Sequence, residues 1–419
     1  MIKAPRGTVD ISPEDIKIWR YIEEEIRRNM DLFYFNEVRT PIFENTELFH
    51  RGVGAETDIV TKEMYTFEDK GGRSLTLKPE GTASVVRFYV EKKYYGIKKL
   101  DKMFYISPMF RYERPQAGRY RQHHQFGVEA LGSDNPLVDV EVISLAIMFY
   151  KGIGLENLEL KLNSVGCPEC RPQYLQELKS FLEQGRERLC ADCQVRMDKN
   201  ALRVLDCKNA ACKNYLVEAP KITEFLCKEC DLHFEEVKST LSRVNISYIL
   251  DPYLVRGLDY YTKTTFEIVA VGIGAQDSIA GGGRYDGLVE MLGGPPTPAV
   301  GFGAGIERLI ATMKKFGIEP PEHEARGVFF VFLDDNARSA GLPLLYACRA
   351  LGISCDMDHF GRSMKAQMKA ANKGGVRSVV IIGEDEVAKE TAIIRDFKTK
   401  DQKEVAFSEL PQYIIKEYY

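Results

Sequence analysis

The chain has 419 residues, of which 44% are hydrophobic and 28% are charged. These fractions are typical of a soluble globular protein, and the length favours two or three domains over a single core. The formal net charge is −4, from 57 Lys and Arg against 61 Asp and Glu. Global charge therefore gives no support to a nucleic-acid partner, and any basic surface would have to be local.

No apolar run approaches the roughly 20 residues that a helix needs to cross a bilayer. The amino terminus, Met-Ile-Lys-Ala-Pro-Arg-Gly, lacks the apolar region of a signal peptide. We therefore expect a cytoplasmic protein with no membrane partner.

The first predicted element is an amphipathic helix with Ser12 as its N-cap and Pro13 at its first position. Its apolar side chains recur at helical spacing: Trp19, Ile22, Ile26 and Met30. Strand-like segments follow through residue 131, and residues 136–150 are predicted to be helical. Because consecutive strands without regular intervening helices favour an antiparallel sheet, we expect an α+β fold.

Residues 111–125, RYERPQAGRYRQHHQ, form the most informative segment of this first half. They separate two apolar runs, 103–110 and 126–131, which we interpret as two strands joined by a loop. Guanidinium groups bind phosphate oxygens in pairs, so the four arginines of this loop suit phosphate binding from a rigid sheet. The alternative is a solvated surface turn.

Residues 167–240 contain most of the cysteines, between helix-prone segments such as 172–189, and we interpret them as an inserted helical module. In a cytosolic protein, cysteine pairs indicate zinc rather than disulfides. Eight thiolates could complete two tetrahedral sites, with three possible couplings of the pairs and with His233 as a substitute ligand in one. Reduced, packed thiols are the alternative. The pairs are Cys167/Cys170, Cys190/Cys193, Cys207/Cys212 and Cys227/Cys230.

Strand patterns resume at residue 248, and two glycine-rich segments follow, GGGRYDG at 281–287 and GFGAGIER at 301–308. The second segment is predicted to run from a strand into a helix. Its glycine spacing does not fit a dinucleotide fingerprint, and the chain has no Walker A sequence. The glycines would let a strand approach a bound ligand closely, or would serve tight packing of a helix on the sheet.

Pro320 and Pro321 predict a linker. Beyond it, strand patterns at 328–333, 353–357 and 379–382 alternate with helices, the second of which starts at Arg362, and this predicts a small parallel-sheet domain. One face of that second helix carries a basic stripe, which suits a phosphate backbone or is simply solvated. The stripe consists of Arg362, Lys365, Lys369 and Lys373.

Several segments resemble the class II aminoacyl-tRNA synthetases. The loop 111–125 is similar to motif 2 of that class, the segment 301–308 to motif 3, and RTPIFE at 39–44 to motif 1. Three further segments narrow the resemblance to histidyl-tRNA synthetases: TLKPEGT at 76–82, RGLDYY at 256–261 and GGGRYDG at 281–287. The segment 361–373 resembles the anticodon-binding domain of these enzymes. The resemblance covers essentially the whole chain.

The resemblance implies a class II antiparallel-sheet catalytic core over 1–166 and 241–320, the helical Cys-rich insertion over 167–240, and an anticodon-binding α/β domain over 326–419. It implies ATP-dependent activation of L-histidine to histidyl-adenylate, and transfer to the 3′ end of histidine tRNA, by a homodimer that uses Mg²⁺. One alternative is the non-catalytic regulatory subunit of ATP phosphoribosyltransferase, which lacks the anticodon-binding domain and departs from the RGLDYY pattern. A synthetase for another amino acid is the second alternative.

The same resemblance assigns roles to single residues. Arg256 and Arg111 would be catalytic, with Arg256 bridging the histidine carboxylate and the α-phosphate; the alternative for Arg256 is a surface ion pair with Asp259. ATP would be bound by Arg111, Glu113, Arg119 and Arg308. Histidine would be bound by Glu80, Thr82, Gln125, Glu129, Tyr260, Tyr261 and Tyr285. Transfer RNA would be contacted by Arg114, Gln116, Arg362, Lys365 and Lys369. Zinc in the insertion, indicated by the cysteine spacing, would depart from the core family pattern, which does not require zinc for catalysis, and would be structural.

Overall fold

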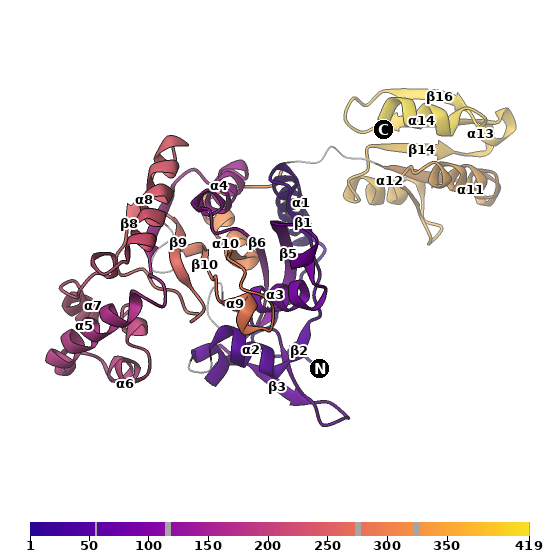
Figure 1. Ribbon diagram of the computed structural model, residues 1–419. Coiled ribbons are helices and arrows are strands. Elements are labelled where there is room, and N and C mark those ends of the chain that lie inside the picture. Colours follow the sequence, from indigo (N-terminus) through magenta and orange to yellow (C-terminus); the bar gives the residue numbers. More distant parts are fainter. Residues whose placement is uncertain (55–56, 114–118, 273–277, 322–326, 419) are drawn as a thin grey trace. The chain divides into compact units, whose positions relative to one another are not determined.

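The computed structural model describes residues 1–54, 57–113, 119–272, 278–321 and 327–418. The chain divides into two compact units, Met1–Pro320 and Pro321–Tyr419 (Figure 1). Within the described ranges, no helix is both long and apolar enough to span a bilayer.

The first unit is built on an eight-stranded sheet in the order β1-β5-β6-β11-β10-β9-β7-β8. Neighbouring strands are antiparallel except at the two edges, where β1 pairs with β5 and β7 pairs with β8 in parallel. This sheet confirms the predicted α+β class. Its strands are Asn36–Glu37, Asp101–Phe110, Gln122–Leu131, Ala299–Gly305, Ser278–Arg284, Thr262–Ala270, Leu158–Ser164 and Ile249–Leu250 in that order.

The strands β5 and β6 form the predicted hairpin, and both are longer than expected from the apolar runs. Their pairing extends from Asp101 opposite Leu131 to Phe110 opposite Gln122. The polar residues 122–125 belong to β6 although they interrupt the apolar pattern. The sheet therefore reaches to within three residues of Arg119, at the end of the Arg-rich loop.

The two faces of the sheet differ in chemistry because successive side chains of a strand point to opposite sides. In β6, Phe126, Val128 and Ala130 are buried in a core that also contains apolar residues of three helices, α1 (Ile16–Leu32), α4 (Pro136–Gly152) and α10 (Ile306–Phe316). The alternate residues Gln125 and Glu129 therefore face the other side. One face of the sheet is covered by helices, and the other carries polar groups.

The first helix begins one turn later than predicted. Residues 13–15 form a turn, the Ser12 hydroxyl oxygen accepts a hydrogen bond from the Asp15 amide at 3.2 Å, and α1 starts at Ile16. Ser12 thus stabilises the turn that precedes the helix instead of capping the helix. The predicted apolar face is correct, since Trp19, Ile22 and Ile26 are buried.

A smaller sheet, in the order β2 (Phe43–Asn45), β4 (Ser74–Leu77), β3 (Tyr65–Glu68), lies in the same unit together with α2 (Thr46–Val53) and a π-helical turn at Ile59–Glu63. The chain then turns at Gly81 into α3 (Thr82–Glu91). Gly81 is in close contact with the Tyr105 ring, so any side chain there would overlap the ring. The start of α3 is therefore held directly against β5.

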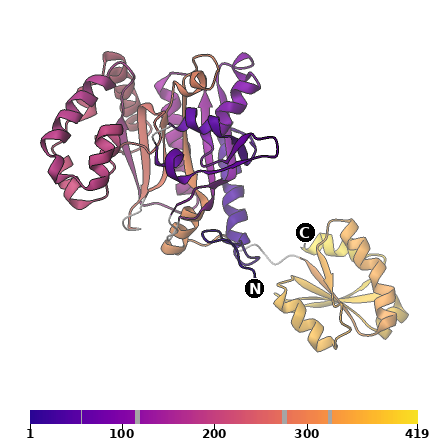
Figure 2. The ribbon, with the colours of Figure 1, turned by 90° about the horizontal axis from the view of Figure 1, so that it is seen from below.

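The segment between β7 and β8 is helical, as predicted. It contains α5 (Arg171–Gln184), α6 (Ala191–Lys199), α7 (Ala210–Leu216) and α8 (Lys228–Arg243), with short 3-10 turns at Arg186–Arg188, Ala201–Val204 and Ile222–Glu224. Figure 2 shows these helices grouped at one side of the first unit. Tyr174, Leu178 and Leu182 of α5 are fully buried in an apolar cluster that also contains residues of α3 and β5, so the module packs against the rest of the first unit.

The second unit contains a five-stranded sheet in the order β13-β12-β14-β15-β16. The three predicted strands, β12 (Val328–Phe332), β13 (Cys355–Met357) and β14 (Ser378–Ile382), are parallel. Two strands that the sequence did not predict, β15 (Thr391–Asp396) and β16 (Gln402–Ala406), are antiparallel. The sheet is therefore mixed, and only part of it is parallel as expected.

Helices cover both faces of this second sheet. Phe330 and Phe332 pack in a cluster with residues of α11 (Asp335–Ala350) and α14 (Leu410–Tyr418), while Phe329 and Val331 pack with residues of α12 (Met364–Lys373). A strand buried on both faces needs a continuous apolar run, which explains the sequence VFFVF. The helix α12 begins two residues after the predicted Arg362, and a short helix, α13 (Glu384–Lys389), was not predicted.

Candidate active site

The polar face of the large sheet carries a cleft of about 900 Å³. Residues from widely separated segments line it, including the ends of the hairpin loop, the 256–261 loop and the start of α10. The cleft-lining residues predicted from the sequence are Glu80, Thr82, Arg111, Glu113, Arg119, Gln125, Arg256, Tyr260, Tyr261 and Arg308. Arg114 and Gln116 lie outside the described residues.

Glycines on the cleft face of β10 and β11 make room for polar side chains. A Cβ atom at Gly281 would overlap the Arg256 guanidinium, and one at Gly301 would overlap the Glu129 carboxylate. At Gly303 it would overlap the Gln125 amide. The helix α10 packs on the opposite face, so these glycines provide close approach at the cleft and do not serve helix packing.

Three arginines and one glutamate gather at one end of the cleft. The Arg111 Nε donates a hydrogen bond to the Pro79 carbonyl oxygen at 2.7 Å, and Arg308 Nη1 donates to the Ser278 carbonyl oxygen at 2.7 Å. Arg119 pairs with Glu113 at 3.1 Å. Burial, followed by the charge of Arg119, lowers the pKa of Arg308. The arginines repel one another, so this end of the cleft favours a multiply charged anion.

Arg256 comes from the loop between β8 and β9 and lies over Gly281. Its Nη1 is 3.1 Å from Glu267 Oε1, and the Ser278 hydroxyl donates to the same oxygen at 2.6 Å. Arg256 thus forms an ion pair with Glu267 across the cleft floor. The surface ion pair with Asp259, considered from the sequence, stays an alternative. Its Nε is buried without a hydrogen-bond partner among the described residues.

Glu129 is fully buried beside the cleft and is held by two hydroxyl groups. Thr82 Oγ1 donates to Glu129 Oε1 at 2.7 Å, and the Tyr285 hydroxyl donates to Oε2. Burial raises the pKa of Glu129 to about 8, against the opposite effect of these two hydrogen bonds. Near neutral pH this carboxyl group therefore retains a proton in the empty cleft.

Glu80 is also buried and caps the start of α3. It accepts hydrogen bonds from the backbone amides of Thr82 at 2.8 Å and Ala83 at 2.9 Å. Burial raises its pKa, although these amides act in the opposite direction. Because Thr82 binds both carboxylates, Glu80 and Glu129 form one connected polar network at the base of the cleft.

Tyrosines form the wall next to this network. The ring centroids of Tyr260 and Tyr261 are 4.8 Å apart, and those of Tyr260 and Tyr285 are 5.6 Å apart. The residue before Tyr285, Arg284, makes an ion pair with Asp139 at 2.6 Å in which both side chains are fully buried. This pair anchors the end of β10 to α4 and thereby fixes the position of Tyr285.

The sequence did not single out Glu267 or Ser278, and it gave no site role to His123; all three line the cleft. The sequence pattern could have indicated Glu267, because this charged residue stands between the apolar residues Phe266 and Ile268 of a strand. The pattern of period two then places it on the polar face. Burial lowers the pKa of His123 to about 3, so its imidazole is neutral.

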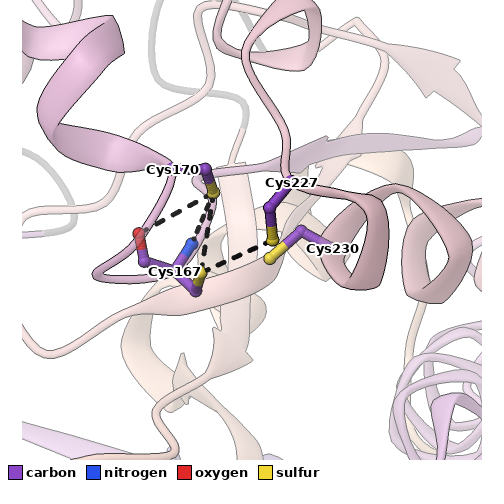
Figure 3. Close-up of side chains that lie close together, drawn as sticks. All are labelled: Cys167, Cys170, Cys227 and Cys230. Carbon is purple, nitrogen blue, oxygen red and sulfur yellow. Dashed lines mark hydrogen bonds between the residues drawn. The ribbon is translucent and has the colours of Figure 1, made fainter.

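The eight cysteines of the insertion form two groups of four, and in each group the sulfur atoms all lie within 4.8 Å of one another. One group contains Cys167, Cys170, Cys227 and Cys230 (Figure 3), and the other contains Cys190, Cys193, Cys207 and Cys212. The structure thus selects one of the three possible couplings. His233 as a substitute ligand is wrong, because its Nε2 lies 3.7 Å from Asp139 Oδ2, and each group is complete without it.

The predicted basic stripe lies in the second unit. Lys365 and Lys369 are exposed on α12, whose other side packs on the sheet through Gln367 and Ala371. Arg362 precedes the helix, and its Nε pairs with the buried Asp358 at 2.5 Å. The lysines therefore belong to the free face of the helix, whereas Arg362 also stabilises the turn before it.

Comparison with known proteins gives a consistent result over both units. The family model of histidyl-tRNA synthetase matches residues 7–309, and that of an anticodon-binding domain matches residues 331–417. The histidine–tRNA ligase of Halothermothrix orenii is 51% identical over 415 residues, which is 99% of both chains. That of Clostridioides difficile is 49% identical over 411 residues, or 98% of both.

Solved structures agree with this result. The crystal structure of apo histidyl-tRNA synthetase from S. aureus is 40% identical, has a TM-score of 0.84 and covers 99% of this chain and 100% of that one. A Bacillus halodurans structure, described as an ATP phosphoribosyltransferase regulatory subunit/histidyl-tRNA synthetase, is 22% identical with a TM-score of 0.65 over 91% of this chain and 98% of that one. At that identity the second likeness shows the fold alone.

Proposed function

The chain belongs to the histidyl-tRNA synthetase family, and from this premise we propose that its cleft joins L-histidine to ATP and then transfers the histidyl group to the 3′ end of histidine tRNA. It is an aminoacyl-tRNA ligase, as its full-length relatives are. One observation carries the assignment of the site. Arginines from three separated segments line one cleft, and the buried Glu129, which accepts hydrogen bonds from two hydroxyl groups, borders the same cleft.

The first step is an attack of the histidine carboxylate on the α-phosphate of ATP. Both reactants are anionic, so the protein mainly has to align them and neutralise their charge. We assign Arg111 to the α-phosphate, Arg119 and Arg308 to the γ-phosphate, and Glu113 to the adenine side. Mg²⁺ supplies further neutralisation of the phosphates when it enters with ATP, and the cleft carboxylates of Glu113 and Glu267 are oxygen donors of the type that it prefers.

We assign Arg256 to the junction between the two substrates. Its guanidinium is fixed from one side by Glu267 and has a close approach to the sheet over Gly281. A group held in this way loses little freedom when it binds the oxygens on which charge develops in the transition state. Arg256 is therefore proposed as the main catalytic residue.

A neutral imidazole offers one hydrogen-bond donor and one acceptor. We assign Glu129 to the N–H group and the Tyr261 hydroxyl to the other nitrogen, with Tyr260 and Tyr285 beside them. Each oxygen of Glu129 already accepts one hydrogen bond, and the unprotonated oxygen retains a second lone pair for the imidazole N–H. The α-ammonium and carboxylate groups of histidine are assigned to Glu80, Thr82 and Gln125.

We assign the catalytic core to residues 1–166 and 241–320, the inserted module to 167–240, and the anticodon-binding domain to 326–419. In that last domain, Arg362, Lys365 and Lys369 are proposed to contact the tRNA backbone, because the lysines occupy an exposed helix face. Arg114 and Gln116, in the motif 2 loop, are proposed to contact the acceptor end.

We propose that the chain forms a homodimer through the motif 1 segment. Three large apolar side chains are exposed on the small sheet and the residue next to it: Ile42 at 44%, Phe43 at 52% and Phe67 at 44%. Apolar groups gathered on one surface indicate an interaction site. This supports self-association through the segment 39–44.

The regulatory-subunit alternative is not supported. The full-length relatives at about half identity are named histidine–tRNA ligases, and the chain has the C-terminal domain that such a subunit would lack. The Bacillus halodurans likeness does not weigh against this conclusion, because it extends to the fold only.

Exchange of pyrophosphate into ATP tests the proposal directly, since it reports adenylate formation without tRNA. We expect exchange that depends on L-histidine and on Mg²⁺. Absence of exchange with every amino acid would support the regulatory module instead. Exchange that depends on a different amino acid would identify another synthetase.

A further inference from the structure

We propose that the two cysteine groups of the inserted module are two structural zinc sites, each with four thiolate ligands. The entry site is Cys167, Cys170, Cys227 and Cys230, and the inner site is Cys190, Cys193, Cys207 and Cys212. This inference rests on the geometry of the module and is independent of the reaction proposed for the cleft.

The spacing of the sulfur atoms carries the inference. In the entry site, Cys167 Sγ lies 3.7 Å from Cys170 Sγ and 3.8 Å from Cys227 Sγ. In the inner site, Cys190 and Cys207 are 3.8 Å apart. A tetrahedron with Zn–S bonds of about 2.3 Å has edges of about 3.8 Å, whereas a disulfide bond is about 2.05 Å long. The separations fit the edges of a zinc tetrahedron, and all eight cysteines are free.

Backbone amides point at the sulfur atoms, as expected around thiolates. The Cys167 amide donates to Cys170 Sγ at 3.2 Å in the entry site. The Cys190 amide donates to Cys212 Sγ at 3.1 Å in the inner site. Such donors compensate part of the negative charge of a tetrathiolate centre and orient its ligands. Packed neutral thiols, which are weak acceptors, would not need them.

Helix ends supply a second source of compensation. Cys170 is the N-cap residue of α5, Cys227 that of α8 and Cys190 that of α6. The N-terminal end of a helix carries partial positive charge and favours an anionic group. Both sites therefore combine anionic ligands with the positive ends of helices, at positions where two segments of the module meet.

The entry site joins the two ends of the insertion. Cys167 and Cys170 follow β7, and Cys227 and Cys230 start α8 (Figure 3). Next to Cys170, the guanidinium of Arg171 donates to the Tyr261 carbonyl oxygen at 2.6 Å, as well as to the Val165 and Gly166 carbonyl oxygens. A metal ion that fixes the start of α5 therefore also fixes the backbone of a residue in the proposed histidine pocket.

The inner site supports another wall of the cleft. Cys207 itself lines the cleft, together with its neighbours Asp206 and Lys208. Of the other ligands, Cys190 caps α6, Cys193 lies on α6 and Cys212 lies on α7, so a bound metal would hold the 205–208 segment against these helices. We therefore expect the 205–208 segment to be rigid beside the cleft only while a metal ion occupies the inner site.

Metal analysis of the full chain, purified without chelators and dialysed against trace zinc, tests the proposal. We expect two zinc ions per chain. Cys230→Ser should lower the content to one by opening the entry site, and Cys193→Ser should do the same at the inner site. Cys355→Ser, in the C-terminal unit, is the matched control and should retain two. A folded, metal-free chain with eight reactive thiols in the module would overturn the proposal.

Cobalt keeps the test decisive if a serine variant fails to fold. Reconstitution of the wild-type chain with Co²⁺ should give the visible spectrum of tetrahedral cobalt thiolate and reach its end point at two equivalents. A spectrum without thiolate charge-transfer bands would exclude these ligands. If two ions bind but no pyrophosphate exchange occurs, the zinc sites are confirmed and the proposed reaction is wrong. If a metal-free chain catalyses exchange, the reaction is confirmed and the zinc sites are wrong.

The link through Arg171 has its own readout. Cys230→Ser should raise the KM for histidine by about threefold to tenfold, the loss of roughly one positioning hydrogen bond, and leave the KM for ATP within about twofold. An equal change in both constants would show that the entry site stabilises the module without positioning Tyr261.

Discussion

The two ends of the cleft handle charge in opposite ways. At the proposed histidine end, Glu129 is fully buried, and its oxygens are bound by Thr82 and Tyr285 before any ligand enters. At the proposed phosphate end, Arg119 keeps 45% of its side chain exposed and has Glu113 as its partner. Selection among similar amino acids needs desolvated, fully paired groups, whereas capture of a polyanion needs accessible positive charge.

Arg256, where the two ends meet, gives the largest expected effect. Arg256→His should lower pyrophosphate exchange by about 10²- to 10³-fold, which is typical for loss of one group that stabilises transition-state charge. Binding of ATP, measured by equilibrium dialysis, should change only a few-fold. Arg377→His is the matched control, since Arg377 is similarly buried and ion-paired in the other unit. Near-normal exchange would remove Arg256 from catalysis.

Glu129→Gln tests the buried end. The KM for histidine should rise by about 10- to 100-fold, because a buried hydrogen-bonding group left without its partner costs roughly 1–3 kcal/mol. The KM for ATP should stay nearly constant in the same exchange assay. Thr82→Ser keeps the hydroxyl that binds Glu129 and serves as the conservative control. A parallel rise in both constants would contradict a separate histidine pocket.

Arg308→Ala and Arg119→Ala compare a more buried and a more exposed arginine at the phosphate end. We expect the KM for ATP to rise about tenfold for Arg308 and about threefold for Arg119, because solvent screens exposed charge. High salt should reduce the Arg119 effect more than the Arg308 effect. The opposite salt response would show that exposure does not determine their contributions.

The last expected effect concerns stability and pH, and not turnover. Since the pKa of Glu129 is raised to about 8 in the folded chain, the unfolded chain loses this proton at lower pH, near about 4.3. The free energy of unfolding should therefore fall as the pH rises between these values, by at most about 1.4 kcal/mol per pH unit. Urea titrations of wild type and Glu129→Gln should show a flatter profile for the variant. Identical profiles would contradict a protonated Glu129.

The sequence predicted the secondary-structure elements better than it predicted how these elements pack together. The hairpin and the strand-to-helix passage at Gly305 follow from local patterns, and the structure has both. The coupling of the cysteine pairs depends on how α5 to α8 fold back, which spacing alone does not determine. The strand β16 was not predicted because it is mostly exposed and polar, so it lacks an apolar run.

The site shows the same limit. Motifs indicated Arg256 and Tyr261, but not Glu267, whose partner lies eleven residues away in sequence and across the cleft floor in space. Ser12 is a second example, since a favourable capping residue was used in a turn and the helix started later. Local propensity predicted the type of structural role correctly, whereas tertiary contacts determined where in the chain that role is used.

The parallel pairing of β7 with β8 has a consequence for how such a chain changes over time. The backbone leaves the sheet after Ser164 and returns at Ile249, next to the strand that it left. A segment that leaves and re-enters a sheet at neighbouring positions can be lengthened, shortened or replaced, because a longer loop has only a modest entropic cost. The inserted module can therefore be gained or lost in evolution without altering the register of the strands that carry the cleft.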